Sequence, residues 1–287
     1  MTSVFEQRLS QHYEALSARL RQAADYVAAN KVAVATRSLR AVASESALPP
    51  ATFSRLSRAL GYSDFEEMRE EMRRGVSARV SSFSERAERL QSAHSKSSRD
   101  ILDLHLEACV NNIRELAEAI DQDELAQTVD RLHAARRVLL VGNLGSTGVV
   151  EYLTYQMNFI AENWSMAGRM GASVGSSLVD LDASDALLVV TKPPFAKRGI
   201  HAARMASEQG AFVVVISDTY SCPAFRHASA RFVVPTDSPN FFSSYTATLV
   251  LVETIAGMLV AKAGRAANLR IAAVEERNRR LEEVWDG

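Results

Sequence analysis

The sequence is poor in cysteine and has almost no net charge. Its two cysteines, Cys109 and Cys222, lie far apart, which excludes a disulfide framework and a cysteine-based zinc cluster and fits a reducing compartment. Lysine and arginine together number 33 against 34 for aspartate and glutamate, so the formal net charge is only −1. Any contact with nucleic acid must therefore come from a local basic patch.

The sequence also lacks a long uninterrupted apolar segment. Residues 1–20 are charged and polar throughout, without the apolar core of a signal peptide. The most apolar helical stretch, 247–263, is interrupted by Glu253 and Thr254 and is too short and too polar to span a bilayer. We expect a cytoplasmic protein with no membrane contact, and 287 residues are enough for two domains.

The first part of the chain, residues 1–80, predicts helices only. Four helical patterns follow one another there without a strand: 13–30, 39–46, 50–60 and 65–74. The Pro49-Pro50 pair marks a turn, and Pro50 is well placed to open the third helix. Gly61 is placed to end it. The second and third helices therefore predict a helix-turn-helix.

The third of these helices has the chemistry of a DNA-reading element. Phe53, Leu56 and Leu60 would face inward, while small polar and cationic groups of the kind that contact bases and phosphates would face outward. Between Arg37 and Arg58 there are four arginines and one acid, Glu45, so the turn is locally basic. The predicted DNA-binding residues are Arg37, Ala51, Thr52, Ser54, Arg55 and Arg58.

The segment from Leu39 to Tyr62, with Phe65 after it, resembles the N-terminal domain of RpiR-type bacterial transcriptional regulators. In that family a helix of pattern Ala-Thr-x-x-Arg-x-x-(Arg/Lys)-x-Leu-Gly enters the DNA. The resemblance implies that Ala51, Thr52, Arg55 and Arg58 take the recognition positions. Pro49 departs from the pattern, because many members have a serine there as helix cap.

Residues 81–100 predict a linker between two domains. Serines interleaved with charged residues bury little apolar surface, so this stretch is either a linker or a frayed extension of the fourth helix. A flexible connection would let the two halves of a dimer adjust to the spacing of DNA half-sites.

The remainder, residues 101–287, predicts an α/β domain. After helices at 101–120 and 123–133, short apolar strands alternate with helices, which is typical of a doubly wound parallel sheet covered on both faces. Long helices at 246–262 and 265–285 close the chain. The five predicted strands are 138–141, 165–167, 186–191, 212–217 and 232–234.

The turn after the first of these strands predicts an anion site. Gly142, Gly145 and Gly148 allow a tight bend, and Ser146 and Thr147 offer hydroxyls at a helix start. The spacing matches neither the dinucleotide fingerprint nor a Walker motif, so a tight turn without ligand is the alternative. Because ligands of parallel sheets bind at the carboxyl ends of the strands, the predicted ligand-binding residues are Gly142, Asn143, Gly145, Ser146, Thr147, Thr191, Lys192, Ser243 and Ser244.

Most of residues 105–262 resembles the sugar isomerase (SIS) domain, an α/β module that binds phosphosugars and forms the C-terminal half of RpiR-type regulators. The resemblance rests on the Gly142 loop with Ser146 and on three further segments: Ser184-Asp185, Ala202-Ala203-Arg204-x-Ala206 with Gly210-Ala211, and Ile216-Ser217-Asp218. The fold class that the two resemblances imply is an all-α helix-turn-helix domain followed by a five-stranded SIS-like α/β domain.

One departure concerns the end of the third strand. Many SIS domains have Ser-x-Ser-Gly there, whereas this chain has Thr191-Lys192-Pro193-Pro194. The prolines remove two backbone donors, and Lys192, with Lys197 and Arg198 nearby, could supply cationic contacts instead. This departure argues against a plain phosphosugar pocket: the ligand would be a carboxylated or otherwise altered metabolite, or the pocket would have lost ligand binding. A rigid surface loop is the alternative for Pro193 and Pro194.

These observations predict a metabolite-responsive transcriptional regulator that is not an enzyme. It would bind double-stranded operator DNA and a small anionic metabolite, a phosphosugar or a sugar acid, as a homodimer or homotetramer, with the helix 265–285 as a subunit contact. No catalytic, metal or cofactor constellation is recognisable. The alternatives are an isomerase-type enzyme with an appended helical domain and a DNA-bound regulator whose SIS domain is only structural.

Overall fold

The computed structural model describes residues 5, 8–9, 12–80, 82–94, 100–169 and 171–285. By its internal contacts the chain divides into two compact units, Met1–Ala108 with Asp237–Ser243, and Cys109–Thr236 with Ser244–Gly287. The division therefore lies within a helix and later than the predicted linker at 81–100. It also assigns seven residues near the end of the second domain to the first unit.

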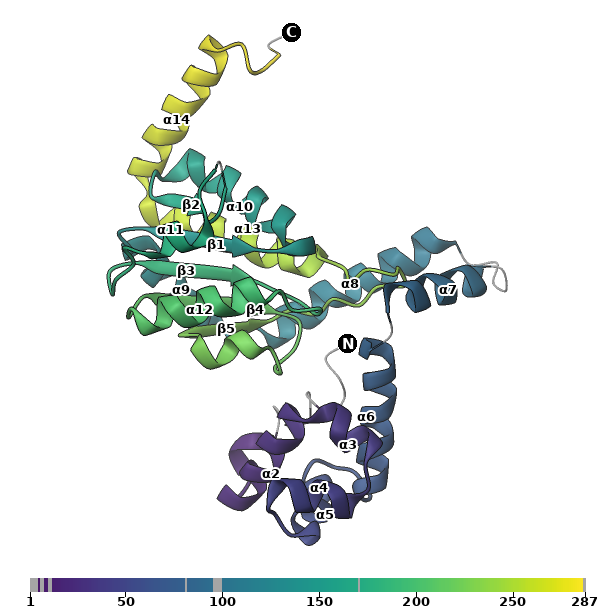
Figure 1. The fold of residues 1–287 in the computed structure, drawn as a ribbon. Coiled ribbons are helices and arrows are strands. Elements are labelled where there is room, and N and C mark those ends of the chain that lie inside the picture. Colours follow the sequence, from purple (N-terminus) through teal and green to yellow (C-terminus); the bar gives the residue numbers. More distant parts are fainter. Residues whose placement is uncertain are drawn as a thin grey trace. The chain divides into compact units, whose positions relative to one another are not determined.

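The first unit is helical. Its core gathers the apolar faces of short helices around Phe53, whose ring meets the rings of Tyr26 and Phe65 edge-on at centroid distances of 6.1 and 6.3 Å. The elements, drawn in Figure 1, are η1 (Tyr13–Ala15), α2 (Ala18–Ala29), α3 (Lys31–Thr36), α4 (Leu39–Ser46), α5 (Pro50–Ala59), α6 (Phe65–Val80), α7 (Phe83–His94) and the first half of α8 (Ile101–Ala119).

Two of these helices were not predicted. The first, α3, resumes after Asn30 and buries Val34 and Ala35, so Asn30 separates two helices and does not precede a loop. The second, α7, occupies the predicted linker. Ser82 and Glu85 cap it reciprocally, because the Glu85 amide donates to Ser82 Oγ at 3.2 Å and the Ser82 amide to Glu85 Oε2 at 2.7 Å.

The second unit is built on a five-stranded parallel sheet of order β2-β1-β3-β4-β5. This confirms the predicted doubly wound α/β fold. Its strands are β1 (Val138–Gly142), β2 (Trp164–Met166), β3 (Ala186–Val190), β4 (Phe212–Ser217) and β5 (Ala230–Val233). Its other elements are α9 (Gln122–Ala134), η2 (Leu144–Ser146), α10 (Thr147–Ile160), α11 (Val174–Leu178), α12 (Lys197–Glu208), η3 (Pro223–His227), α13 (Thr246–Ala263) and α14 (Arg265–Arg280).

Both faces of the sheet are covered by helices (Figure 1). Alternate residues of β1 point to opposite sides: Val138 and Leu140 pack with α9, α10 and α13, whereas Leu139 and Val141 pack with α11, α12 and η3. Burial on both sides explains why the strands are continuous apolar runs. The chain winds from β1 outward to β2 and then returns to β3, so the winding reverses between β1 and β3.

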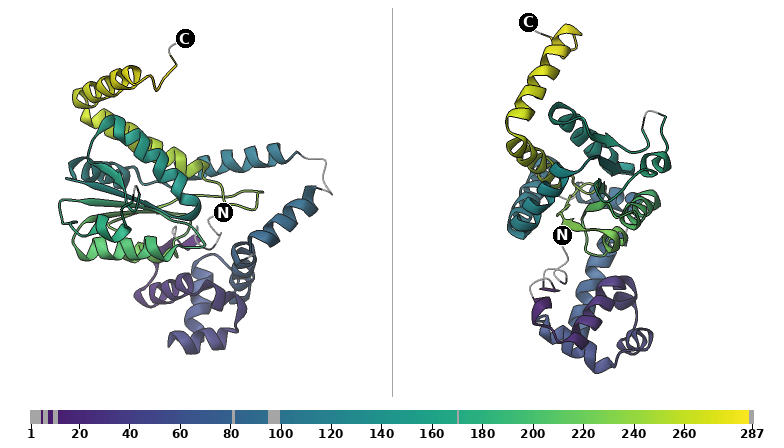
Figure 2. Two further views of the ribbon diagram at one scale, coloured as in Figure 1. Left: turned by 45° about the horizontal axis from the view of Figure 1, so that its top comes forward. Right: turned by 90° about the vertical axis from the view of Figure 1, so that its left-hand side faces the viewer.

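Two long helices complete the second unit. By length and composition α13 is the one described helix that could cross a membrane, but Leu251, Val252 and Ile255 are buried in the core against the sheet. In contrast, α14 is mostly exposed and projects beyond α10 and α13 (Figure 2). Its apolar residue Leu269 is 62% exposed, and Leu281 and Val284 beyond its end are also exposed.

Candidate functional site

The exposed face of α5 carries most of the predicted DNA-binding side chains. Ala51, Arg55 and Arg58 are exposed and recur at intervals of four and three residues, so they lie on one side of the helix, and Ser54 beside them is half-buried. The opposite side is the core, where Phe53, Leu56 and Leu60 have no exposed surface. No acidic residue occurs within α5.

The predicted outward orientation of Thr52 is wrong. It was expected to point outward, but it is 1% exposed. The reason is its spacing: Thr52, Leu56 and Leu60 lie four residues apart and share the buried stripe. Arg37 is exposed but pairs with Glu45, so its charge is partly neutralised.

The turn before α5 has the predicted form. Ser38 caps α4 by accepting a hydrogen bond from the Ala41 amide at 3.4 Å, and Ala47 ends α4 in the left-handed region with φ +55°. The first turn of α5 has no side-chain cap at Pro49. The two helices are therefore joined by three residues, Ala47 to Pro49.

The end of α5 is fixed by a glycine and a cation. Gly61 has φ +80°, as its predicted role in ending the helix requires. Arg8 donates to the carbonyl oxygens of Leu60 and Gly61 at 3.3 and 2.5 Å and lies over the ring of Tyr62. A cation at the negative end of a helix is favourable, so Arg8 helps to hold the helix in place.

The second candidate site lies at the carboxyl edge of the sheet. Gly142 pairs in register with Val190, so the loops after β1 and β3 leave the sheet side by side at the point where the winding reverses. Gly142 has no room for a side chain, since a β-carbon there would lie 2.5 Å from Ser146 O. Leu144 in the loop is 67% exposed and has φ +55°. Such backbone strain in a non-glycine residue clusters at functional sites.

Three of the predicted ligand-binding residues are brought together through Tyr245. Ser146 Oγ shares a hydrogen bond of 3.1 Å with the Tyr245 hydroxyl, and Lys192 Nζ lies 3.6 Å from the centre of the Tyr245 ring. Lys192 Nζ also donates to Ser244 O at 3.0 Å. The predicted set therefore forms one connected cluster in which Ser146, Lys192 and Ser244 are all buried.

The remaining predicted residues take surrounding positions. Thr147 Oγ1 donates weakly to Gly142 O at 3.4 Å, and Thr191 is 4% exposed at the end of β3. Gly145 is exposed on the loop beneath the Tyr245 hydroxyl, and Ser243 is half-buried. Tyr245 itself was missed, because an aromatic residue before a helix gives no ligand-binding signal in the sequence.

The cluster is electrostatically unusual. Burial lowers the pKa of Lys192 to about 7, against an ordinary value of 10.5, and the negative charge of Asp218 opposes this shift. Burial also raises the pKa of Tyr245. Among the described residues, Asn143 Oδ1 and Asp218 Oδ1 are buried without a hydrogen-bond partner. The Lys192 cluster thus holds a buried cation close to a carboxylate, Asp218, that has one unsatisfied oxygen, whereas Asn143 Oδ1 lies next to Gly199 of α12.

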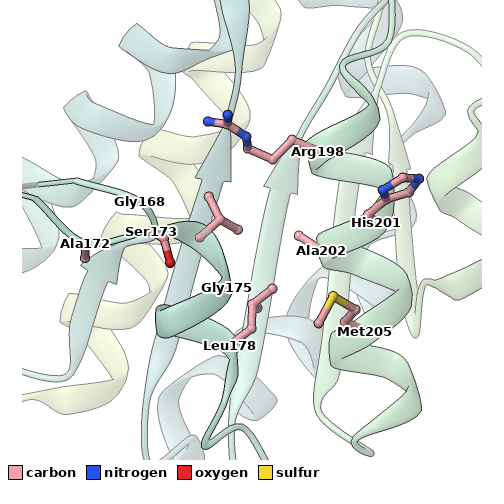
Figure 3. A pocket seen from close by; sticks show the side chains of 10 residues that line it. Gly168, Ala172, Ser173, Gly175, Leu178, Arg198, His201, Ala202 and Met205 are labelled. Carbon is pink, nitrogen blue, oxygen red and sulfur yellow. The ribbon is translucent and has the colours of Figure 1, made fainter.

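A separate cavity of about 550 Å³ lies between α11 and α12 (Figure 3). Arg198 on α12 reaches toward the loop that precedes α11, His201 lines the rim with its ring turned away from that loop, and Leu178 and Met205 give the cavity an apolar wall. None of the nine predicted ligand-binding residues lines it. It is therefore distinct from the cluster around Lys192.

Two protein families account for most of the chain. Residues 4–79 match the helix-turn-helix domain of the rpiR family, and residues 131–258 match the SIS domain. No curated protein sequence matches the chain.

Solved structures share the fold at low sequence identity. The NanR protein of Vibrio vulnificus, complexed with ManNAc-6P, is 22% identical with a TM-score of 0.58 over 97% of this chain and 98% of that one. The sugar isomerase domain of an RpiR transcription factor from Sphaerobacter thermophilus is 16% identical with a TM-score of 0.57 over 61% of this chain and 97% of that one. A putative sugar-phosphate isomerase from Listeria monocytogenes is 16% identical with a TM-score of 0.50, covering 57% of this chain and 88% of that one.

An rpiR-family helix-turn-helix followed by a SIS domain defines a class of DNA-binding regulator. The chain belongs to this class: it is an RpiR-type transcriptional regulator.

Proposed function

We propose that this regulator reads operator DNA with the exposed face of α5 and binds an anionic metabolite at the cluster around Lys192. It would act in the cytoplasm as a homodimer or homotetramer, so that two α5 helices face two half-sites. The metabolite would change operator affinity by binding one arrangement of the protein more tightly than another.

The DNA-binding part rests on the separation of the two faces of α5. Its core side is fully buried, and its outward side presents Arg55 and Arg58 with no acid in the helix. Residues in the N-terminal part of a recognition helix contact base edges, and basic residues elsewhere contact phosphates. Ala51, Ser54 and Arg55 belong to the first group, while Arg58 stands in the last turn.

Fluorescence anisotropy with DNA from upstream of the coding gene tests this assignment. The double variant Arg55→Ala, Arg58→Ala should lose specific binding, because each good base contact contributes about 1–3 kcal/mol. The exposed Arg19 on α2 provides the matched control, and Arg19→Ala should bind as the wild type does. Operator binding that survives the double substitution would contradict the assignment to α5.

The metabolite-binding part rests on the buried ammonium of Lys192. A phosphate or carboxylate would form charge-assisted hydrogen bonds with it, which are about twice as strong as neutral ones. Lys192 lies at the carboxyl edge of the sheet, where ligands of doubly wound sheets bind. NanR, which shares the fold, was solved with a phosphosugar, so phosphosugars and sugar acids are the first compounds to test.

A thermal-shift panel of hexosamine phosphates, ketose phosphates and sugar acids tests this part. A ligand at 100 times its Kd should stabilise the protein by about 2.7 kcal/mol. The shift should vanish in Ser146→Ala or Lys192→Met and persist in Lys197→Met, since Lys197 is exposed at the start of α12. If no compound produces a shift, the SIS domain is structural only.

We also propose that the chain is not an enzyme. Isomerisation of a sugar phosphate needs an acid and a base that can exchange protons with the substrate. Lys192, with a pKa of about 7, and the Tyr245 hydroxyl could exchange protons, so the proposal rests instead on the rpiR-family helix-turn-helix that precedes the SIS domain. Turnover of sugar phosphates at rates of about 1 s⁻¹ or more, typical of enzymes, would favour the isomerase alternative.

A further inference from the structure

The loop between β5 and α13 belongs to both units of the chain. Residues 237–243, which we call the strap, group with the helical first unit, whereas the residues at its two ends, Thr236 and Ser244, group with the second unit. The ends are joined to each other, because the Ser244 amide donates to Thr236 O at 3.0 Å. The strap is thus a short closed loop with a hydrogen-bonded neck.

The neck is held by residues at the carboxyl ends of two strands. Lys192, after β3, donates from Nζ to Ser244 O at 3.0 Å and lies over the ring of Tyr245, the next residue. Asp218, after β4, accepts a hydrogen bond at Oδ2 from Thr236 Oγ1 at 3.1 Å. Each side of the neck therefore has one contact with the edge of the sheet where the metabolite is proposed to bind.

The far end of the strap packs on the helices of the first unit. The ring of Phe242 stacks on Phe83 of α7 with a centroid distance of 4.5 Å and an interplanar angle of 29°. Phe241 meets the same ring edge-on at 6.5 Å. Asn240 Nδ2 lies 3.5 Å from His105 Nδ1 on α8. These contacts tie the strap to α7 and α8, the second and third helices after α5 in the chain.

The buried ammonium of Lys192 is difficult to explain by a structural role alone. Its side chain is 7% exposed, and no ion pair to it occurs among the described residues. A buried ammonium with one carbonyl acceptor and one ring face is less well solvated than in water, and an apolar side chain of similar length would fill the space without that cost. A polar partner that arrives from outside would restore the missing interactions.

We propose that Lys192 links the metabolite site to the strap, so that an anionic ligand which captures its ammonium frees Ser244 and loosens the strap's hold on α7. This inference rests on the proposed function, because it assigns a regulatory role to the same site. Without ligand, the ammonium holds the neck. With ligand, the charge-assisted bond to phosphate or carboxylate replaces the bond to the Ser244 carbonyl. The neck is the element whose two arrangements the ligand would bias.

Hydrogen–deuterium exchange on the full-length protein tests the role of Lys192 without any ligand. Lys192→Met keeps the length of the side chain and removes the ammonium. Exchange in peptides covering the strap and α7 should become at least about fivefold faster, the low end of the usual coupling between sites. Exchange in β4 should not change. Lys197→Met, which alters an exposed lysine of the same segment, should behave as the wild type.

A second arm uses ManNAc-6P, inorganic phosphate and the compounds that give a thermal shift. Each compound that binds should accelerate exchange of the wild-type strap and α7 and should leave exchange in β4 unchanged. Binding that leaves the strap unchanged, or a Lys192→Met variant with wild-type exchange, overturns the inference. If no compound binds, the proposed metabolite site fails, while the ligand-free comparison still decides whether Lys192 holds the strap.

Discussion

Lys192 is a residue that the fold retains at a cost in stability. Burial lowers its pKa to about 7 from an ordinary 10.5, so below pH 7 the folded state carries a charge that would be better solvated in the unfolded chain. Each unit of pKa shift corresponds to about 1.4 kcal/mol. Removing the ammonium also leaves the Ser244 carbonyl without its donor, which offsets about 1 kcal/mol of any gain.

The expected result is that Lys192→Met is more stable than the wild type at pH 6, by about 1–3 kcal/mol. The sign follows from proton binding: between pH 7 and 10.5 the unfolded state binds more protons at Lys192, so wild-type stability rises with pH and the difference closes. Urea unfolding at pH 6, 7.5 and 9 measures this. A wild type that is the more stable protein at pH 6 would refute it.

Asp185 illustrates the opposite case, a buried charge that stabilises. It is 1% exposed. Its carboxylate oxygens accept hydrogen bonds from Arg136 Nε at 3.0 Å, from Arg136 Nη2 at 2.7 Å and from the Asp182 amide at 2.9 Å. The hydrogen bond from Arg136 is the main cause that lowers the pKa of Asp185. The stability contributed by this carboxylate is therefore present above the unfolded pKa of about 3.9 and is lost as the pH falls through the folded value.

We expect Asp185→Asn to cost about 2–3 kcal/mol at pH 7, somewhat less than a fully buried pair because Arg136 is partly exposed. Below pH 3 the cost should shrink, since the wild-type carboxyl is then protonated as well. Chemical denaturation at pH 7 and below pH 3 measures the loss of unfolding free energy under each condition. Asp180→Asn, at an exposed neighbour, should have little effect at either pH.

Ala47 offers a stabilising substitution in the helix-turn-helix. Its φ of +55° is unfavourable for alanine but not for glycine, so Ala47→Gly should raise stability by about 0.5–1 kcal/mol. Ser44 on the same helix is exposed and has helical geometry, so Ser44→Gly should instead cost about 0.5 kcal/mol. Thermal unfolding of the two variants compares them directly. Equal destabilisation by both would mean that the turn is not strained.

At the residue scale the sequence predicts side-chain chemistry better than orientation. Gly61 and Pro50 occupy their predicted places because a left-handed turn and the first position of a helix each favour a particular residue type. The buried orientation of Thr52 was missed because the sequence pattern specifies which residue type occupies a position and not which face of the helix that residue lies on. Tyr245 was missed because its role depends on Lys192, which is 53 residues away in the chain and is brought close only by the fold.

At the scale of elements, periodicity predicts long helices and buried strands and misses short or polar ones. The bounds of α4 and β4 match the prediction, since a helix with a cap and an uninterrupted apolar strand are both unambiguous. In α7 the serine-rich composition suggested a linker, yet the Ser82 to Glu85 spacing of a capping box was present in the sequence. Composition alone was the weaker signal there.

Within α5, Arg55 and Arg58 should contribute to DNA binding in different ways. Arg55 lies in the middle of the helix and should reach base edges, so Arg55→Ala should cost about 1–3 kcal/mol on the operator and relax its sequence preference. Arg58 lies in the last turn and should contact phosphate. Arg58→Ala should therefore weaken binding to all sequences alike and reduce the slope of log K against log salt by about 0.9.

Salt titrations of operator and unrelated DNA separate the two roles. The measurement needs six curves, because Arg55→Ala, Arg58→Ala and the reference variant Arg19→Ala are each titrated on both DNAs. If Arg55→Ala reduced the salt slope and left specificity unchanged, the register of α5 on the DNA would differ from the one proposed.

For the whole molecule, the central question is how a site on the α/β sheet can influence a helix-turn-helix. The two units are connected by α8 and by the strap, whose ends belong to the sheet unit and whose middle belongs to the helical unit. Coupling between two sites requires an element with two arrangements that both sites bias. We propose the strap for this role, because its neck is bonded to Lys192 and its aromatic residues are stacked on α7.

The effector response should therefore depend on Phe83, although Phe83 belongs to neither site. Phe83→Ala removes the ring on which Phe241 and Phe242 pack and leaves α5 and Lys192 intact. Operator affinity without effector should shift toward the affinity that the wild type shows with effector, because the contact that the ligand loosens is already lost. The ratio of operator Kd with and without effector, typically about 5–150-fold in coupled systems, should fall toward one.

The control for this experiment is Leu102→Ala, which removes another exposed apolar side chain, 67% exposed against 41% for Phe83, from α8 and should keep the response. Combining Phe83→Ala with Thr236→Val, which removes the hydroxyl that donates to Asp218 at the neck and leaves Lys192 in place, then shows whether the neck and Phe83 act in one path. On one path the double variant responds no less than either single variant, because the connection is already broken. Independent, additive losses would mean that the signal reaches the DNA-binding helices through α8 instead of the strap.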